Sequence, residues 1–195
     1  MKKIILASGS PRRRELLTQI GISFEVVKAE GEEKITTDDP EEAVKELAMQ
    51  KAQEVAGRVD ADVVIGADTV VAVDGEIMGK PKDPADAARM IHRIQGRDHE
   101  VLTGVAVILK KGEVETTINF AETTRVHVFP MTEEEIQAYV ASKEPMDKAG
   151  AYGIQGLFAA YVSGIEGDYN NVVGLPVGRL YQEVKAIADV DLRTL

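Results

Sequence analysis

Residues 4–21 read IILASGSPRRRELLTQIG and join a short apolar run to the start of a helix. We predict the apolar run, Ile4 to Ala7, to be a buried strand. Ser10 is a suitable helix N-cap, and Pro11 at the first helical position has its φ angle already set. A strand, a turn of small residues and a helix N-terminus together aim backbone N–H groups and the helix dipole at one spot. The segment therefore predicts an anion-binding site.

Arginines and hydroxyl groups surround this predicted anion site. Ser8, Arg12 and Arg13 are the candidate ligands, because a guanidinium can meet two phosphate oxygens at once. Arg14 is expected to point elsewhere, since three successive helical residues cannot share one face. The alternative is a capped surface helix with solvated arginines. Arginine in the first turn opposes the helix dipole, however, and a purely structural helix would favour Asp or Glu there.

Apolar patterns farther along the chain predict strands and helices that mix without strict alternation. The predicted helices span residues 11–20, 40–57, 84–95, 132–142 and 176–187. The predicted strands span residues 4–7, 24–27, 62–67, 70–73, 76–78, 101–109, 114–128 and 158–162. This order favours an α/β fold with a mixed, twisted sheet and flanking helices rather than a doubly wound Rossmann sheet. We expect one domain over residues 1–195, a length that also suits two small lobes around a cleft.

The composition excludes several classes of function. With 44% hydrophobic and 29% charged residues the chain is expected to be globular, and it has no apolar run long enough for a membrane span. The absence of cysteine excludes disulfides and thiolate chemistry and suits a cytoplasmic location. A net charge of -10 argues against nucleic acid and anionic membranes as partners. An acidic protein that binds a polyanion must gather its positive charge in one place.

Asp68 follows the most apolar predicted strand of the chain, residues 62–67. Ligands of open α/β sheets commonly bind where such strands end. A carboxylate at that position is suited to binding Mg²⁺ or to accepting a proton from water. The alternative is that Asp68 only turns the chain by bonding its own backbone.

Lysines and glutamates on other predicted elements offer further ligands. Lys51 lies on the apolar stripe of its helix, and Lys80 follows a predicted hairpin, so both are candidates for contacting a triphosphate. For Lys51 the alternative is snorkelling to water. Glu30, Glu32 and Glu33 are candidate metal ligands, or else a solvated acidic loop.

Residues 147–156 read DKAGAYGIQG, and their small side chains allow close backbone approach to a ligand. Gln155 offers an amide donor and acceptor that suit the edge of a base, although an ordinary tight turn also explains the glycines. His92, His99 and His127 lie on separate predicted elements without metal-ligand spacing, so we interpret them as structural.

Five segments in chain order resemble motifs of the Maf family, also called septum formation proteins: residues 8–13, 66–69, 79–81, 147–156 and 174–176. The resemblance implies a two-lobed, inosine-triphosphatase-like α/β fold. It also implies a house-cleaning nucleoside triphosphate pyrophosphatase that depends on a divalent cation, Mg²⁺ or Mn²⁺. As partners it implies a nucleoside triphosphate and, in the family pattern, a second copy of the chain.

The resemblance also assigns roles to individual residues. Asp68 matches the family's catalytic proton acceptor, while Glu33, Lys51 and Lys80 match cleft residues tied to metal or phosphate. We hypothesise that the cation bridges phosphate oxygens to Glu33 and Asp68. Asp68 cannot be fully committed as both metal ligand and free base, and the sequence leaves the two roles open.

Arg12, Thr69 and Gln155 match family positions linked to a preference for dTTP and UTP. The sequence therefore predicts hydrolysis of these nucleotides to the monophosphate and pyrophosphate. The alternative is a nucleotide-binding regulator of cell division with little turnover. A carboxylate placed among phosphates gives a pure binder no advantage unless a metal intervenes, which favours the enzyme.

Overall fold

The computed structural model describes residues 2–195 and contains a seven-stranded sheet. Its strands are β1 (Ile4–Leu6), β2 (Glu25–Val26), β3 (Val63–Val73), β4 (Glu76–Met78), β5 (Asp98–Lys111), β6 (Val114–Val128) and β7 (Val162–Glu166). Their order is β2-β1-β3-β5-β6-β7, and β4 pairs with β3. β1 runs parallel to β2 and β3, whereas the remaining pairs are antiparallel. The predicted mixed sheet is confirmed.

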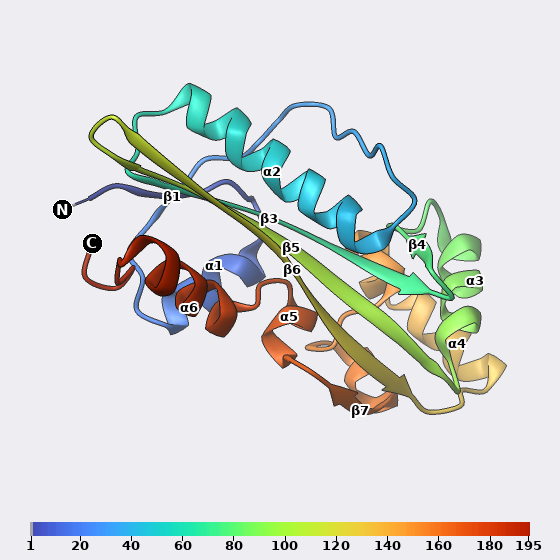
Figure 1. The fold of residues 1–195 in the computed structure, drawn as a ribbon. Helices are drawn as coiled ribbons and strands as arrows, with labels where there is room; N and C mark the ends of the chain where they lie inside the picture. The colour runs from blue at the N-terminus through green and yellow to red at the C-terminus, as the bar shows by residue number, and fades with distance from the viewer. Residues whose placement is uncertain (1) are drawn as a thin grey trace.

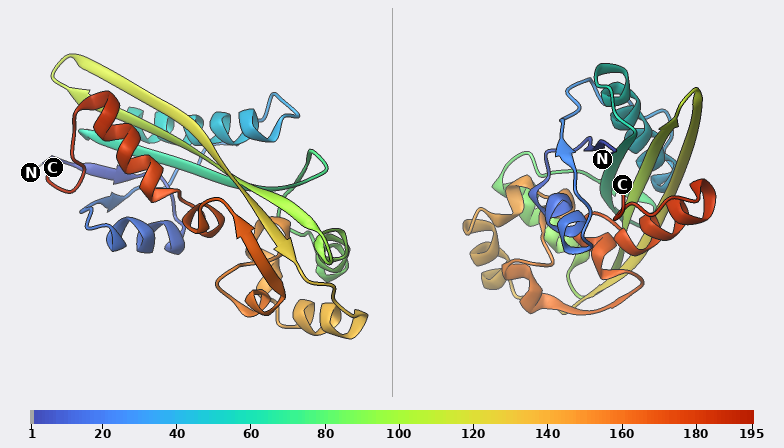
Figure 2. Two further views of the ribbon diagram at one scale, coloured as in Figure 1. Left: turned by 60° about the horizontal axis from the view of Figure 1, so that its bottom comes forward. Right: turned by 90° about the vertical axis from the view of Figure 1, so that its left-hand side faces the viewer.

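Helices cover this sheet on both faces. They are α1 (Pro11–Gln19), α2 (Pro40–Arg58), α3 (Pro84–Ile94), α4 (Glu133–Ala141), α5 (Tyr169–Val173) and α6 (Val177–Ala188), with the 3₁₀ helices η1 (Glu144–Asp147), η2 (Ala149–Ala151) and η3 (Leu157–Tyr161). α2 lies along one side of the long strands, and α1 and α6 lie on the other (Figures 1 and 2). We call the end with α1, α6 and the chain termini the first lobe. The end with α3, α4 and the 3₁₀ helices is the second lobe.

Two glycines let α2 lie directly on the sheet. A Cβ atom at Gly66 would stand 2.3 Å from the carbonyl oxygen of Ala48, and one at Gly104 would stand 2.0 Å from that of Val44. Any side chain at either glycine would push the helix backbone away, because no flexible group there can move aside. This contact determines which α2 side chains reach the middle of β3.

Side chains of β3 alternate between the two faces of the sheet. Val64 and Val70 belong to the cores under α2, whereas Ile65 belongs to the core on the opposite face. By the same alternation Asp68 points to the side of α2 and Thr69 to the side of α1. The side chains of Asp68 and Thr69 therefore lie on opposite faces of the sheet.

Two predictions of strands are wrong. The predicted strands 62–67 and 70–73 form the single strand β3, because pairing with β5 continues through Asp68 and Thr69. Asp68 therefore lies within a strand and does not follow its end. The predicted strand 158–162 is largely η3, and β7 begins only at Val162. Phe158 is fully buried while the two alanines after it are exposed, so this stretch lacks the alternation of a half-buried strand.

Candidate active site

A cleft of about 1090 Å³ receives side chains from both lobes. One wall comes from the strand-to-helix segment before and within α1, and the other from the segment between α4 and η3. Nine of the predicted site residues line it: Ser8, Arg12, Arg13, Glu33, Lys51, Asp68, Thr69, Lys80 and Gln155. Glu30 and Glu32, the other candidate metal ligands, are exposed and are not among its lining residues. The fold therefore brings together residues that are spread over most of the chain.

An opening in the edge of β3 explains how Asp68 reaches this cleft. β1 pairs with residues 63–65 of β3, and β4 pairs with residues 71–73. In the described part of the chain, no strand pairs with that edge between these two stretches. Side chains from both faces of β3 border the opening, so Asp68 and Thr69 line the same cleft despite pointing to opposite faces.

Two carboxylates meet one ammonium group in the cleft. The Nζ atom of Lys51 contacts Oδ1 of Asp68 and lies 2.9 Å from Oε1 of Glu33. The side chains of Lys51 and Asp68 are only 16% and 15% exposed, whereas Glu33 is 55% exposed. Lys51 therefore does not extend to bulk water, and Asp68 does not serve merely to turn the chain. The pair of carboxylates surrounds a position that suits a cation.

Arg13 joins three parts of the first lobe. Its guanidinium donates from Nε to the carbonyl oxygen of Gly174 at 2.8 Å, from Nη1 to Ser8 Oγ at 3.0 Å and from Nη2 to Thr69 Oγ1 at 3.0 Å. Burial lowers the pKa of Arg13, and the nearby negative charge of Asp68 opposes this shift. Within residues 2–195 no carboxylate lies within 4.0 Å of this guanidinium.

The hydroxyl of Thr69 is held in a chain of hydrogen bonds. Besides accepting from Arg13, it lies 2.9 Å from Oγ1 of Thr103, which donates to the carbonyl oxygen of Asn171 at 3.1 Å. Thr103 and Asn171 are fully buried. Thr69 therefore orients the Arg13 guanidinium, and its role in substrate preference stays a prediction.

Three basic side chains line the cleft without a partner. Among residues 2–195, the side chains of Arg12, Lys28 and Lys80 have no hydrogen bond or ion pair to the protein. Lys28 was not among the predicted residues. Its stem crosses Gly9, where a Cβ atom would stand 2.6 Å from Lys28 Cε. No pattern in the sequence marks this lysine, because α1 separates it along the chain from the loop that it covers.

The glycine-rich wall presents Gln155 on a tight turn. The N–H of Gly156 donates to the carbonyl oxygen of Gly153 at 3.2 Å, and Gln155 between them is exposed. At the start of the turn, the Tyr152 hydroxyl lies 2.6 Å from Nε2 of His99. Burial lowers the pKa of His99 to about 4 and raises the pKa of Tyr152, so both side chains are neutral near pH 7. The interpretation of His99 as structural agrees with this position.

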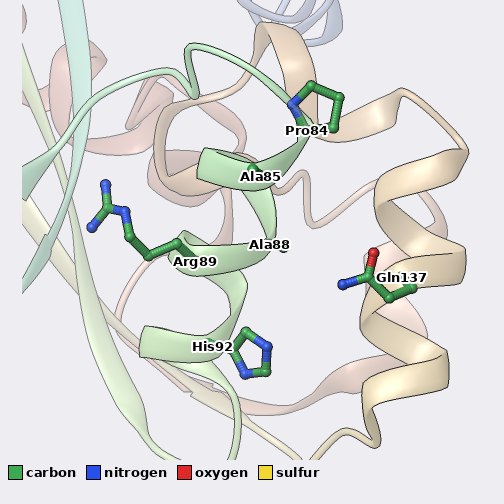
Figure 3. A pocket seen from close by; sticks show the side chains of 6 residues that line it. All are labelled: Pro84, Ala85, Ala88, Arg89, His92 and Gln137. Carbon is green, nitrogen blue, oxygen red and sulfur yellow. The ribbon is translucent and has the colours of Figure 1, made fainter.

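A second, smaller hollow of about 550 Å³ lies between α3 and α4. Figure 3 shows its lining, which is Pro84, Ala85, Ala88, Arg89, His92 and Gln137. None of the predicted site residues lies there, and His92 is paired at 3.0 Å with Glu133.

Neither a protein-only metal site nor a membrane span is found in the described residues. Residues 2–195 contain no cluster of three or more His, Cys, Asp or Glu side chains that could hold a metal ion. Over the same range, no helix has both the length and the apolar character needed to cross a bilayer.

The fold and the cleft define an α/β protein whose lobes enclose a site suited to a multiply charged anion. A family model described as Maf-like protein matches residues 3–187. The chain belongs to this family, as its motifs predicted.

Relatives resemble the chain over nearly its whole length. It is 52% identical to a dTTP/UTP pyrophosphatase of Agathobacter rectalis, over 96% of this chain and 98% of that protein. It is also 52% identical to a dTTP/UTP pyrophosphatase of Bacillus cereus, over 95% of this chain and 90% of that protein. Among solved structures it is similar to the Staphylococcus aureus Ham1 protein, with a TM-score of 0.48 and 16% identity over 65% of this chain and 72% of the other.

Proposed function

We propose that the protein hydrolyses nucleoside triphosphates, preferentially dTTP and UTP, to the nucleoside monophosphate and pyrophosphate. The observation that carries the proposal is the charge arrangement of the cleft. Basic side chains without protein partners surround the carboxylates of Glu33 and Asp68, which share Lys51. Basic groups without a protein partner are available to bind phosphates. Carboxylates would repel phosphates in a protein that only binds them, so their presence favours a catalytic role. The activity named for the relatives is of the same kind.

The wall formed by the segment before and within α1, here called the first wall, binds the phosphates. The N-terminus of α1 and the free guanidinium of Arg12 hold the outer phosphates, and Lys80 adds charge from the opposite side of the cleft. Arg13 keeps Ser8 and Thr69 in position and contributes its own positive charge.

The two carboxylates also fit a divalent cation, Mg²⁺ or Mn²⁺. Glu33 and Asp68 already surround one cationic group, the ammonium of Lys51. Magnesium is commonly held by one or two carboxylates, with substrate phosphates and water completing its shell. Glu33 and Asp68 would hold the cation, which when bound would neutralise charge on the phosphate oxygens.

Asp68 accepts the proton of the attacking water. Its Oδ1 contacts Lys51, whereas Oδ2 has no hydrogen-bond partner within residues 2–195. The free oxygen takes the proton while the water oxygen bonds to phosphorus. The bond between the α and β phosphates breaks, and pyrophosphate leaves with the electron pair.

Gln155 selects the base. A uracil or thymine edge presents carbonyl acceptors around an N3–H donor, which an amide complements with its own N–H and C=O. Cytosine reverses two of these groups, so the same amide faces at least one mismatched partner, and a site built to hydrogen-bond one group rejects the other.

The test is a nucleotide panel with purified protein and either Mg²⁺ or Mn²⁺. We expect release of pyrophosphate, with UTP and dTTP hydrolysed well above CTP and ATP. Calorimetric binding of nucleotides without pyrophosphate release would instead support the nucleotide-binding regulator of cell division. Light scattering on the same sample tests the predicted homodimer.

A further inference from the structure

The turn that carries Gln155 rests on the carboxylate of Glu144, the first residue of η1. Oε2 of Glu144 accepts a hydrogen bond from the backbone N–H of Leu157 at 2.9 Å. Oε1 accepts one from the hydroxyl of Tyr139 at 3.0 Å. Glu144 therefore connects the end of α4 with the residue that follows the turn.

Gly156 shows how closely the carboxylate fits beneath the turn. A Cβ atom at this position would stand 2.3 Å from Oε1 and 2.5 Å from Oε2 of Glu144. The φ angle of Gly156 is -103°, which residues with a side chain also adopt. A side chain at this position would therefore displace the carboxylate below it, whereas the backbone conformation itself does not call for glycine.

The other end of the turn is supported by Lys148. Its Nζ atom donates to the carbonyl oxygen of Glu144 at 2.9 Å and to Asp147 Oδ1 at 2.7 Å. A Cβ atom at Gly153 would stand 2.6 Å from Lys148 Cε. The two side chains support the turn at its two glycines and leave Gln155 exposed between them.

Glu144 lines the cleft, yet its contacts leave it little capacity to read a base. Each of its oxygens already accepts a hydrogen bond from the protein. Burial and the Glu144 carboxylate raise the pKa of Tyr139, so the Tyr139 hydroxyl remains a donor at working pH. The carboxylate is therefore held by fixed donors and in turn holds the backbone after Gln155.

We infer that Glu144 is a positioning residue that determines base selectivity by fixing the turn of Gln155. The inference rests on the proposed function, in which Gln155 reads the base. An amide that must complement N3–H and a carbonyl needs a fixed backbone, since misplacement by about 1 Å can cost a large part of the effect. Glu144 supplies that constraint through Leu157 and Gly156.

The test compares Glu144→Ala, Gly156→Ala and the double variant with the wild type, measuring kcat/KM for UTP and CTP. We expect Glu144→Ala to narrow the UTP-to-CTP ratio by roughly tenfold, mainly through a lower value for UTP. Gly156→Ala should have a similar effect, because its methyl group displaces the carboxylate. The double variant should have the same UTP-to-CTP ratio as Glu144→Ala. Both changes remove the same contact, and the effects of substitutions at contacting residues do not add. Glu144→Gln keeps one acceptor oxygen, so its UTP-to-CTP ratio should lie between those of the wild type and Glu144→Ala.

Calorimetric affinities for non-hydrolysable UTP and CTP analogues provide a second readout that does not require turnover. Absence of pyrophosphate release by the wild type, with base-dependent binding that Glu144→Ala reduces, would refute only the proposed function. An unchanged selectivity in Glu144→Ala, with a clear change in Gln155→Ala, would refute the role of Glu144. Equal losses for both nucleotides together with a lower melting temperature would show a merely structural role and also overturn the inference.

Discussion

The two walls of the cleft recognise a nucleotide in different ways. In the wall built on α1, charged side chains such as Arg12 face the cleft directly, next to the half-buried Arg13 and the carboxylate of Asp68. In the glycine-rich wall, Gln155 is exposed on a turn whose charged supports, Glu144 and Lys148, are engaged with the protein. A phosphate is recognised by charge, which acts over several ångströms, whereas a base edge is recognised by hydrogen bonds that need exact placement.

This difference predicts that the first wall determines the rate of hydrolysis and that the glycine-rich wall determines the preference between nucleotides. Loss of a charge in the first wall should slow the hydrolysis of every nucleotide. Disturbance of the turn should change the ratio between nucleotides and leave the reaction itself largely intact. Substitutions in both walls therefore test the comparison directly.

The largest effect is expected for Asp68→Asn. The change keeps the shape of the side chain and removes the proton acceptor, which should lower kcat by about 10²–10⁴-fold for all nucleotides alike. Pyrophosphate release measures the loss, and calorimetry should show that nucleotide binding is retained. Turnover near the wild-type rate would remove Asp68 from the mechanism.

Arg12→Ala and Arg13→Ala form a matched pair in the first wall. The Arg12 guanidinium has no protein partner in the described part of the chain, so its loss should lower kcat/KM by roughly ten- to hundredfold without lowering the melting temperature. Arg13 joins Ser8, Thr69 and Gly174, so its loss should lower both kcat/KM and the melting temperature. Thermal unfolding of the two variants side by side gives the measurement. Equal melting temperatures would contradict the structural role of Arg13.

Gln155→Ala tests the second wall. Removing the amide should narrow the preference for UTP over CTP by roughly tenfold, while the slower hydrolysis of CTP changes little. The measurement is kcat/KM for four nucleotides in both proteins. If the order of preference survives unchanged, the base is read elsewhere.

His99 makes the support of the second wall sensitive to acid. Its pKa is about 4 in the folded protein and 6.5 ordinarily, so only the unfolded chain takes up this proton between these values. The free energy of unfolding should therefore fall as the pH drops from 6.5 to 4, by roughly 2–3 kcal/mol from this group, and should not change through it above pH 7. Denaturant unfolding of the wild type and His99→Gln at several pH values measures the effect. The same slope in both proteins would contradict it.

The smallest effect is expected for Lys28→Ala. This exposed lysine reaches the phosphate wall across Gly9, and an exposed charge contributes up to about 1 kcal/mol, so kcat/KM should fall by about two- to fivefold. Added salt should reduce the difference between variant and wild type. A difference that is unaffected by salt would argue against a contact based on charge.

Local signals in the sequence predicted much of the fold and several of the side chains that line the cleft, among them Arg12, Asp68 and Gln155. The Asp74-Gly75 turn joins β3 and β4 with positive φ angles, as expected for a two-residue hairpin. The capping box of Thr132 and Glu135 begins α4. These signals succeed because caps and turns depend on residues only a few positions apart. The functional roles of the site residues stay predictions.

The tertiary structure alone decided how those residues meet. Asp68 reaches the cleft because β1 ends and β4 begins on either side of it, which depends on strand register over long distances. Lys28 covers Gly9, and Glu144 lies under Gly156, through contacts between segments that no local pattern connects. The sequence by itself determined the mixed α/β class, the family and several of the residues that line the cleft. The physical reason for the division is range: periodicity, caps and turns act within a few residues, whereas the positions of the cleft residues depend on packing across the whole sheet.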